Sequence, residues 1–282
     1  ATDVGNNSAV CSFVVTVRDQ TPPVLSACPG NINVGNTPNA CGANVSWTPP
    51  TASDNCGTVV LTTNHNPGAF FGIGQTNVVY TATDASGNTA VCTFSIRVND
   101  TQAPTLICPA NITVNTPAND CFAPATWTIP TPADNCQGAV ISNATHQPGS
   151  SFQLGTTTVR YTAVDAAGTS TSCSFTVTVV DNVPPKAVCV PTFTINLNGN
   201  GIATLNPVLL NAGSTDNCGI SAYTAQPELF TCTQVGVQVV TLVVSDNAGN
   251  TASCTTTISV NASPVCTPPV IGNSGAVSYT HL

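Results

Sequence analysis

The sequence predicts an all-β fold built from tandem modules of about 80 residues, a length within the usual range of a domain. Three observations point to it: the chain repeats itself along its length, its repeats contain stretches in which apolar and polar residues alternate, and residues that favour helices are scarce. There is no Met, and Glu228 and Lys186 are the only Glu and the only Lys. Thr, Ser and Asn supply most of the polar surface instead, and they suit strands and turns.

The repeat is clearest in the cysteines, which recur at nearly equal intervals in three series. The series are Cys28, Cys108 and Cys189; Cys56, Cys136 and Cys218; and Cys11, Cys92, Cys173 and Cys254. Such a period predicts one structural unit per repeat. We expect complete modules at residues 21–100, 101–181 and 182–260, with 1–20 as the C-terminal tail of a preceding repeat and 261–282 as the start of another repeat or an artefactual tail.

The last stretch of each module shows the strongest strand pattern. Cys92, Phe94, Ile96 and Val98 alternate with polar or small residues, as in a half-buried strand. A second apolar stretch precedes it, and a D-x-x-G-N type segment between them is typical of a turn. Several short strands punctuated by Pro, Gly and Asn indicate an immunoglobulin-like β-sandwich. Proline at the junctions (RDQTPP, NDTQAP and DNVPP) predicts short, stiff linkers.

Composition excludes several classes of partner. The formal net charge is −8 and the four basic residues are scattered, so the clustered cations that bind nucleic acid are missing. No stretch reaches the roughly 18 apolar residues of a spanning helix, so we expect no membrane insertion within these residues. Fourteen cysteines without the CxxC or Cys/His pairs of zinc sites favour disulfides, and therefore an extracellular, secreted or cell-surface location.

The third module suggests how the cysteines pair. It lacks a counterpart of Cys41 and Cys121 but gains Cys232, so we expect the lost and the gained cysteine to share one partner. Cys218 suits best, because Cys218 and Cys232 are spaced almost as Cys41 and Cys56 are. The predicted bonds are Cys28–Cys92, Cys41–Cys56, Cys108–Cys173, Cys121–Cys136, Cys189–Cys254 and Cys218–Cys232, which leaves Cys11 and Cys266 without a partner in this chain.

Ten of the twelve acidic residues fall at three recurring places: the linkers, the position before Asn-Cys, and the start of the last hairpin. In an immunoglobulin-like topology these places converge at each module junction. Calcium binds through carboxylate and amide oxygens, so one hypothesis is calcium at the junctions; the alternative is that these side chains cap turns. The candidate ligands are Asp19, Asp54, Asn55, Asp84 and Asn88; Asp100, Asp134, Asn135 and Asp165, with Thr169 in place of the last Asn; and Asp181, Asp216, Asn217, Asp246 and Asn250.

No catalytic arrangement is recognisable, and we expect the chain not to be an enzyme. His65 and His146 occupy matched positions, but nothing at matching positions supplies a nucleophile or a carboxylate. We therefore expect both histidines in loops.

The aromatic residues allow more than one interpretation. Trp47 and Trp127 lie on apolar strands and are expected in the core, although a sugar-stacking surface is the alternative. Phe70, Phe71 and Phe152 lie near P-G loops, where they form either an adhesive tip or ordinary hairpin positions.

Several motifs occur in the same order in the first two modules. They are CPGNINV and CPANITV, VSWTPPTASDN and ATWTIPTPADN, and HNPGAFFGIGQTNVVYTATDASGNTAVCTFSIRV. These modules resemble the HYR (hyalin repeat) family end to end, which implies an extracellular immunoglobulin-like module associated with adhesion and matrix and without enzymatic activity. Many members carry only the first and last cysteines, consistent with Cys28–Cys92. The third module opens with CVPTFTIN and lacks the Trp, so it resembles a related Ig-like repeat.

Two functions remain open at this point. The first is a non-catalytic structural and adhesive stalk or filament segment that meets a protein or glycan ligand at a cell surface or matrix. The extra cysteine pair and the tandem arrangement look more like bacterial surface proteins than animal members of the family. The second is a carbohydrate-binding accessory region of a secreted hydrolase. Neither requires a cofactor, apart from the calcium hypothesised at the junctions.

Overall fold

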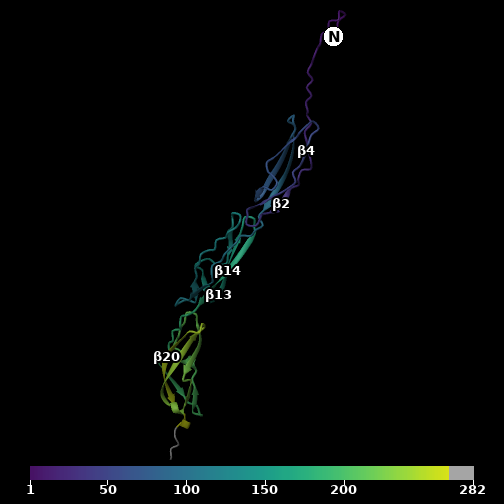
Figure 1. The fold of residues 1–282 in the computed structure, drawn as a ribbon. Coiled ribbons are helices and arrows are strands. Elements are labelled where there is room, and N and C mark those ends of the chain that lie inside the picture. The colour runs from purple at the N-terminus through teal and green to yellow at the C-terminus, as the bar shows by residue number, and fades with distance from the viewer. Residues whose placement is uncertain (267–282) are drawn as a thin grey trace, which may run out of the picture. The chain divides into compact units, whose positions relative to one another are not determined.

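The computed structural model describes residues 1–266, and its regular elements there are strands apart from three short 3-10 helices (Figure 1). The described residues pack into two compact units. The first comprises Ala1–Ile107, Pro130–Asn143 and Tyr161–Cys173, and the second comprises the rest. Each unit therefore holds one complete outer module and one end of the second module. No helix in the described part of the chain is long and apolar enough to span a membrane.

The first module contains eight strands. They are β1 (Val24–Leu25), β2 (Ile32–Gly35), β3 (Gly42–Asn44), β4 (Ala52–Ser53), β5 (Val60–Thr63), β6 (Phe70–Gly72), β7 (Gly74–Thr83) and β8 (Thr89–Asn99). The main sheet has the order β2-β8-β7-β5, while β3 pairs with β6 and β1 with β4. β7 and β8 form the predicted antiparallel hairpin, and β2 joins β8 in parallel. The last hairpin is thus the centre of the module.

The second and third modules repeat this topology. The strands of the second are β9 (Ile112–Asn115), β10 (Phe122–Pro124), β11 (Val140–Ala144), β12 (Ser151–Gln153), β13 (Gly155–Val164) and β14 (Ser170–Val180). Those of the third are β15 (Thr192–Asn196), β16 (Ile202–Thr204), β17 (Ile220–Gln226), β18 (Leu229–Thr231), β19 (Gly236–Asp246) and β20 (Thr251–Asn261). Their main sheets have the orders β11-β13-β14-β9 and β15-β20-β19-β17, and β10-β12 and β16-β18 form the smaller pairs. The predicted tandem β-sandwich fold is confirmed.

The core of the first module follows the alternation in the sequence. Phe94, Ile96 and Val98 on β8 are buried and face Phe71 on β6 across the sandwich. Trp47 packs at the edge of this cluster, with its ring 6.0 Å from that of Phe71 and 5.5 Å from that of Phe94. Period-2 alternation therefore places one face of the hairpin in the core, as expected.

The third module builds its core without a tryptophan. Leu205, Leu210 and Phe230 are at most 1% exposed. Leu210 ends a 3-10 helix, η1 (Pro207–Leu210), whose first turn is capped by the side chain of Asn206. The capped turn points an apolar residue inward where a strand would alternate, which explains how this module closes its sandwich with a different sequence.

Residues 1–20 contain a single bridge, Thr2 to Ser8. Phe13 is 83% exposed and Val15 is 71% exposed, although both follow the same alternation as β8. The interpretation of this segment as the tail of a preceding repeat stays a prediction. Most of the predicted segment 261–282 lies outside the described residues.

The sandwich predicts contrasting roles for two adjacent phenylalanines. Phe71→Ala should destabilise the first module by about 3–5 kcal/mol, because it removes a ring that is 3% exposed. Phe70→Ala is the matched control: this ring is 59% exposed, and its loss should cost about 0.5 kcal/mol. Urea unfolding followed by Trp47 fluorescence, in a Trp127→Phe background, measures both. Equal losses would show that the two faces of β6 are misassigned.

Candidate functional site at the module junctions

Two long-range disulfides hold the outer modules closed. Cys28 bonds to Cys92 on β8 with 5.7 Å between their Cα atoms, and Cys189 bonds to Cys254 on β20 with 5.8 Å. Both pairs were predicted. Each ties the segment ahead of the first main-sheet strand to the last strand of its module. Cys108 and Cys173, their counterparts in the second module, are also disulfide-bonded.

Three of the other predicted pairs, Cys41–Cys56, Cys121–Cys136 and Cys218–Cys232, are wrong. Cys41 bonds to Cys136, 95 residues away, and not to Cys56. Cys121 bonds to Cys218, 97 residues away, and not to Cys136. These two bonds fasten each module to the next. The prediction Cys218–Cys232 fails as a consequence.

The third module uses its extra cysteine differently. Cys232 bonds to Cys266, which was expected to have no partner in this chain. The two free cysteines are Cys11, as predicted, and Cys56, which was not. The charge of Asp19, followed by burial and the charge of Asp54, raises the pKa of the Cys56 thiol. Cys56 is therefore a poor nucleophile near neutral pH.

The short spacing between Cys41 and Cys56 misled the prediction because they lie at opposite ends of the module. Beside Cys41, the Asn39 N–H donates to the side-chain oxygen of Gln102 in the following linker at 2.8 Å. Cys56 lies instead beside Asp19 in the preceding linker. One signal was available: the third module keeps Cys218 although it has no counterpart of Cys41, which fits a bond to the preceding module.

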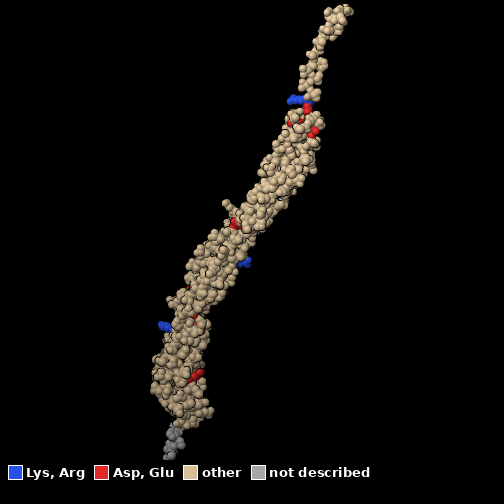
Figure 2. All heavy atoms as spheres, in the orientation of Figure 1, with Lys and Arg blue, Asp and Glu red and all other residues tan. Residues whose placement is uncertain are grey.

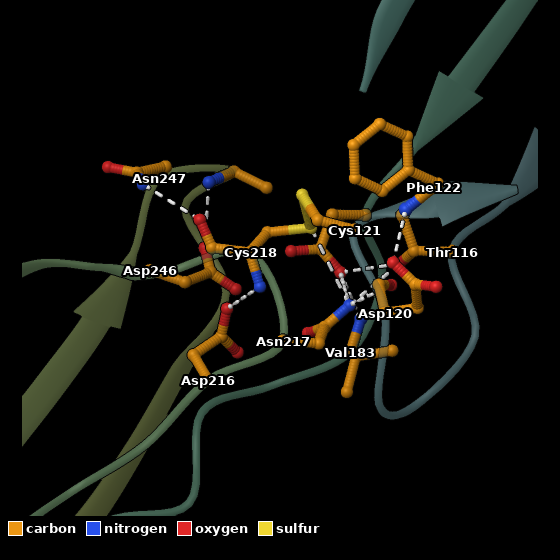
Figure 3. Close-up of a disulfide and its surroundings, with 12 residues drawn as sticks. Thr116, Asp120, Cys121, Phe122, Val183, Asp216, Asn217, Cys218, Asp246 and Asn247 are labelled. Carbon is orange, nitrogen blue, oxygen red and sulfur yellow. Dashed lines mark hydrogen bonds between the residues drawn. A yellow bond between two sulfur atoms is a disulfide. The ribbon is translucent and has the colours of Figure 1, made fainter. Parts of the chain in front are cut away.

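Asparagines reinforce both intermodule bonds. Asn135 precedes Cys136, and its Nδ2 donates to the carbonyl oxygen of Ala40 at 3.1 Å. Asn217 precedes Cys218, and its Nδ2 donates to Thr116 Oγ1 at 3.1 Å and to backbone carbonyl oxygens of the same loop (Figure 3). The Asn-Cys pair therefore joins two modules through one covalent bond and one amide. Sequence reasoning assigned both asparagines to calcium and missed this role.

The first junction brings the predicted acidic residues together. One oxygen each from Asp19, Asp54 and Asp84 lies within 4.8 Å of the others. Asp84 accepts hydrogen bonds from the Asn88 N–H at 2.8 Å and from Asn88 Nδ2 at 2.7 Å. Asn88 Nδ2 also donates to the carbonyl oxygen of Asp19 at 3.3 Å. Asn88 therefore ties the turn to the linker through its N–H groups.

The third junction has the same arrangement. Oxygens of Asp181, Asp216 and Asp246 lie within 4.8 Å of one another. Asp246 accepts from the Asn250 N–H and from Asn250 Nδ2, both at 2.8 Å. Asp216 Oδ2 caps the N–H of Cys218 at 2.8 Å, which is visible beside the disulfide in Figure 3.

The second junction is different. Its cluster contains Asp100 and Asp134 together with Cys136, whose sulfur is in a disulfide. Asp165 is not in it: the Thr169 hydroxyl donates to Asp165 and also to the carbonyl oxygen of Gln102. Two of the expected carboxylates therefore meet here, against three at each of the other junctions.

Turn capping explains part of the acidic pattern but not all of it. Burial acts to raise the pKa of Asp84 and of Asp165, but hydrogen bonds from their turns outweigh it, and each pKa lies below its usual value. By contrast, Oδ1 of Asp54, Asp134 and Asp216 is buried without a hydrogen-bond partner. A buried acceptor left unpaired costs about 1–3 kcal/mol. These orphaned oxygens need a partner that a turn does not supply. The side-chain oxygen of Asn55 is not among these buried unpaired oxygens, and its Nδ2 donates to Cys56 Sγ at 3.2 Å.

The other candidate residues pack within the modules. The ring of His65 lies 5.2 Å from that of Phe71, and the ring of His146 lies 5.0 Å from that of Phe152. Trp127 packs against Phe152 and Phe175 with ring separations of 6.1 Å and 5.2 Å. Trp47 Nε1 donates to Tyr80 Oη at 2.9 Å. The tryptophans thus occupy core positions.

Of the three candidates for an adhesive tip, Phe71 and Phe152 are buried and Phe70 is exposed.

Two stretches of the chain match a known domain family. Residues 18–98 and 99–179 match the HYR domain. The chain is 38% identical over 283 residues to Hyalin of Strongylocentrotus purpuratus and 37% identical over 284 residues to Hyalin of Lytechinus variegatus. Each alignment covers 96% of this chain but 23% and 53% of the respective relative. The chain thus spans about half, or less, of the relatives it matches.

A more distant relative and a solved structure extend the comparison. The chain is 32% identical over 229 residues to the Sushi, von Willebrand factor type A, EGF and pentraxin domain-containing protein 1 of Rattus norvegicus, which covers 80% of this chain and 6% of that protein. The extracellular domain of Protocadherin GammaB4 aligns with a TM-score of 0.35 and 15% identity, over 88% of this chain and 51% of that one. The sequence relatives named here are animal proteins, so the expected bacterial source finds no support. None of them indicates a catalytic family.

Peptide mapping of the unreduced protein tests the intermodule bonds. Proteolysis should release the Cys41 peptide joined to the Cys136 peptide, and the Cys121 peptide joined to the Cys218 peptide, because these sulfurs are paired in the structure. Iodoacetamide should label Cys11 and Cys56 without reduction. Cys28 joined to Cys92 is the internal control. A Cys41–Cys56 peptide would refute the arrangement.

Acidification should weaken the turn that Asp165 caps. Its lowered pKa means that the stability it contributes is fully present above the ordinary Asp pKa of about 4 and is lost as pH falls through its folded-state pKa. Thermal unfolding between neutral pH and about pH 2 measures this loss. Asp165→Asn, which accepts similar hydrogen bonds but carries no charge, should lose less stability than the parent on acidification. An identical loss of stability in both proteins would show that Asp165 does not contribute to the acid sensitivity.

Proposed function

This chain belongs to the HYR domain family, and we propose that it is a segment of an extracellular adhesive protein, in which disulfides close each module and fasten it to the next. The observation that carries the proposal is the pair of bonds between modules, Cys41–Cys136 and Cys121–Cys218. Proteins that work in the oxidising environment outside the cell retain such bonds. The hyalin relatives support the extracellular location.

The cross-links suit a protein that carries load. In the chain-entropy model, closing a loop of 95 residues stabilises the folded state by about 4–5 kcal/mol. More important for a stalk, a covalent bond does not slip under tension, whereas the polar contacts around Asn135 would exchange with water. We infer that pulling on the chain loads the linker and the cystine together, so that adjacent modules resist separation.

The surface suits contact with neutral partners better than charged ones. Figure 2 shows isolated blue and red atoms on a face that is otherwise neither basic nor acidic. Only 6% of residues are charged, so long-range electrostatic steering contributes little to how partners meet. We propose a protein or glycan ligand recognised by short-range polar and apolar contacts.

The carbohydrate-binding alternative loses its main support. It needed Trp47 and Trp127 as an exposed platform, but both rings pack against core phenylalanines. The aromatic candidates are Trp47, Trp127, Phe70, Phe71 and Phe152. Of these five described residues, Phe70 is the one whose ring is strongly exposed. A single exposed ring does not make an aromatic row.

Single-molecule pulling tests the load-bearing role. In the oxidised protein, the residues between Cys28 and Cys92 should stay sequestered when the first module unfolds, because the bond spans 64 residues. Adding a reductant should lengthen the unfolding step by roughly 200 Å for this module. The control also lacks the intermodule bond that would otherwise close residues 41–136: Cys28→Ser/Cys41→Ser/Cys92→Ser/Cys136→Ser should show the long step in both conditions. A long step in the oxidised parent would contradict the stapled stalk.

Cell attachment tests the adhesive role separately. Surfaces coated with the oxidised chain should retain cells under shear, and the reduced and alkylated chain should retain fewer, because its modules lose their staples. If neither coating retains cells, the adhesive role fails while the load-bearing role stands on its own measurement.

A further inference from the structure

We propose that the acidic cluster of the third junction, formed by Asp181, Asp216 and Asp246 with the amide oxygen of Asn217, binds one calcium ion. The cluster lies within one compact unit, between the end of β14 and the hairpin of β19 and β20. The site is independent of the adhesive role, since the cross-linked chain could bind cells with or without it.

The first argument is the set of buried oxygens that lack a hydrogen-bond donor. Asp181 is 3% exposed; its Oδ1 accepts from Thr116 Oγ1 at 2.9 Å and from the Val183 N–H at 3.0 Å, but its Oδ2 has no partner. Asp216 Oδ1 and Asn217 Oδ1 are likewise buried without a partner. Carboxylate and amide oxygens can only accept, so each of these buried oxygens needs a donor or a cation that the described residues do not supply. Two carboxylate oxygens and one amide oxygen at this one junction share that need.

The second argument is the charge at the cluster. Oxygens of three carboxylates lie within 4.8 Å of one another. Like charges at such a distance repel strongly where water is excluded. Within the described part of the chain, no Lys or Arg hydrogen-bonds to the orphaned oxygens. A divalent cation between the carboxylates would convert this repulsion into attraction.

The ligand chemistry favours calcium. The donors are carboxylate and amide oxygens, which hard cations prefer, while zinc sites in proteins are built mainly from His and Cys. Cys218 is excluded as a thiolate because it is bonded to Cys121. Calcium also accepts variable geometry and completes its shell with water, whereas magnesium demands a near-octahedral set.

Neighbouring groups hold these ligands in place before any ion arrives. Two backbone N–H groups and Asn250 Nδ2 fix the carboxylate of Asp246. The Cys218 N–H fixes Asp216 through Oδ2, which leaves Oδ1 available. Asn217 Nδ2 is anchored on the loop that carries Cys121, so its Oδ1 is held as well. Asn250 therefore positions Asp246 through its N–H groups, a role that the sequence did not indicate.

An open cavity beside the cluster gives an ion access from solvent. A cavity of about 470 Å³ is lined by Val183, Thr215, Asp216 and Asn217, with Lys186 also on its wall. Two of the proposed ligands therefore border open space. Lys186 lines the same cavity, so removing its positive charge should not weaken calcium binding.

Equilibrium dialysis with ⁴⁵Ca²⁺ on the full oxidised chain tests the site. The parent chain carries Asp54→Asn, which removes the matching carboxylate of the first junction. This parent should bind calcium, and adding Asp216→Asn should weaken the tightest site at least tenfold, because the amide still caps the Cys218 N–H but carries no charge. The matched control is Asp134→Asn, at the same position of the second junction, where Asp165 is absent from the cluster. This variant should leave the tightest site unchanged.

An unchanged disulfide map and unchanged thermal unfolding without metal would show that Asp216→Asn folds normally. Lys186→Gln should bind calcium at least as tightly as the parent. No binding by the parent at millimolar calcium, or equal affinity in Asp216→Asn, would overturn the proposal, as would equal affinity for magnesium and calcium.

Discussion

A cystine between consecutive modules is the constraint on which the junctions depend. It holds the loop ahead of β3 against the Asn-Cys loop of the next module, where the amide of Asn135 donates to the carbonyl oxygen of Ala40. Hydrophobic burial stabilises each sandwich from within. The polar loops at the junctions have little apolar surface to bury, so a covalent bond determines which of their groups meet.

The sequence was a good guide wherever a feature is local or periodic. The alternation at Phe94, Ile96 and Val98 identified the central hairpin, since period-2 alternation is a direct consequence of strand geometry. The recurrence of the acidic residues correctly indicated that Asp19, Asp54 and Asp84 meet. The direction of the amide groups was not predictable, because Asn88 serves equally well in sequence as a cation ligand or as an N–H donor.

The cysteine pairing failed for a geometric reason. Proximity in sequence suggested Cys41–Cys56, but the extended segment between them is long enough to run from one end of a module to the other. The first two modules also place an equivalent phenylalanine on different strands of the same pair. A Cβ at Gly42 would lie 2.3 Å from the ring of Phe70, whereas the second module has Phe122 in the place of Gly42 and Ser151 in that of Phe70. Each of the first two modules thus has one phenylalanine at this pair of positions, a compensation that neither position reveals alone.

The cross-links also give the chain a direction. Each uses a cysteine from the trailing end of one module and a cysteine from the leading end of the next, so the two halves of the connection are unlike and cannot pair with themselves. The third module keeps the leading half, Cys218, and has no counterpart of the trailing half. Its extra cysteine is instead closed locally with Cys266. The order of the cysteines therefore gives the cross-linked series a polarity, and the third module lacks the cysteine with which the first two modules bind their successors.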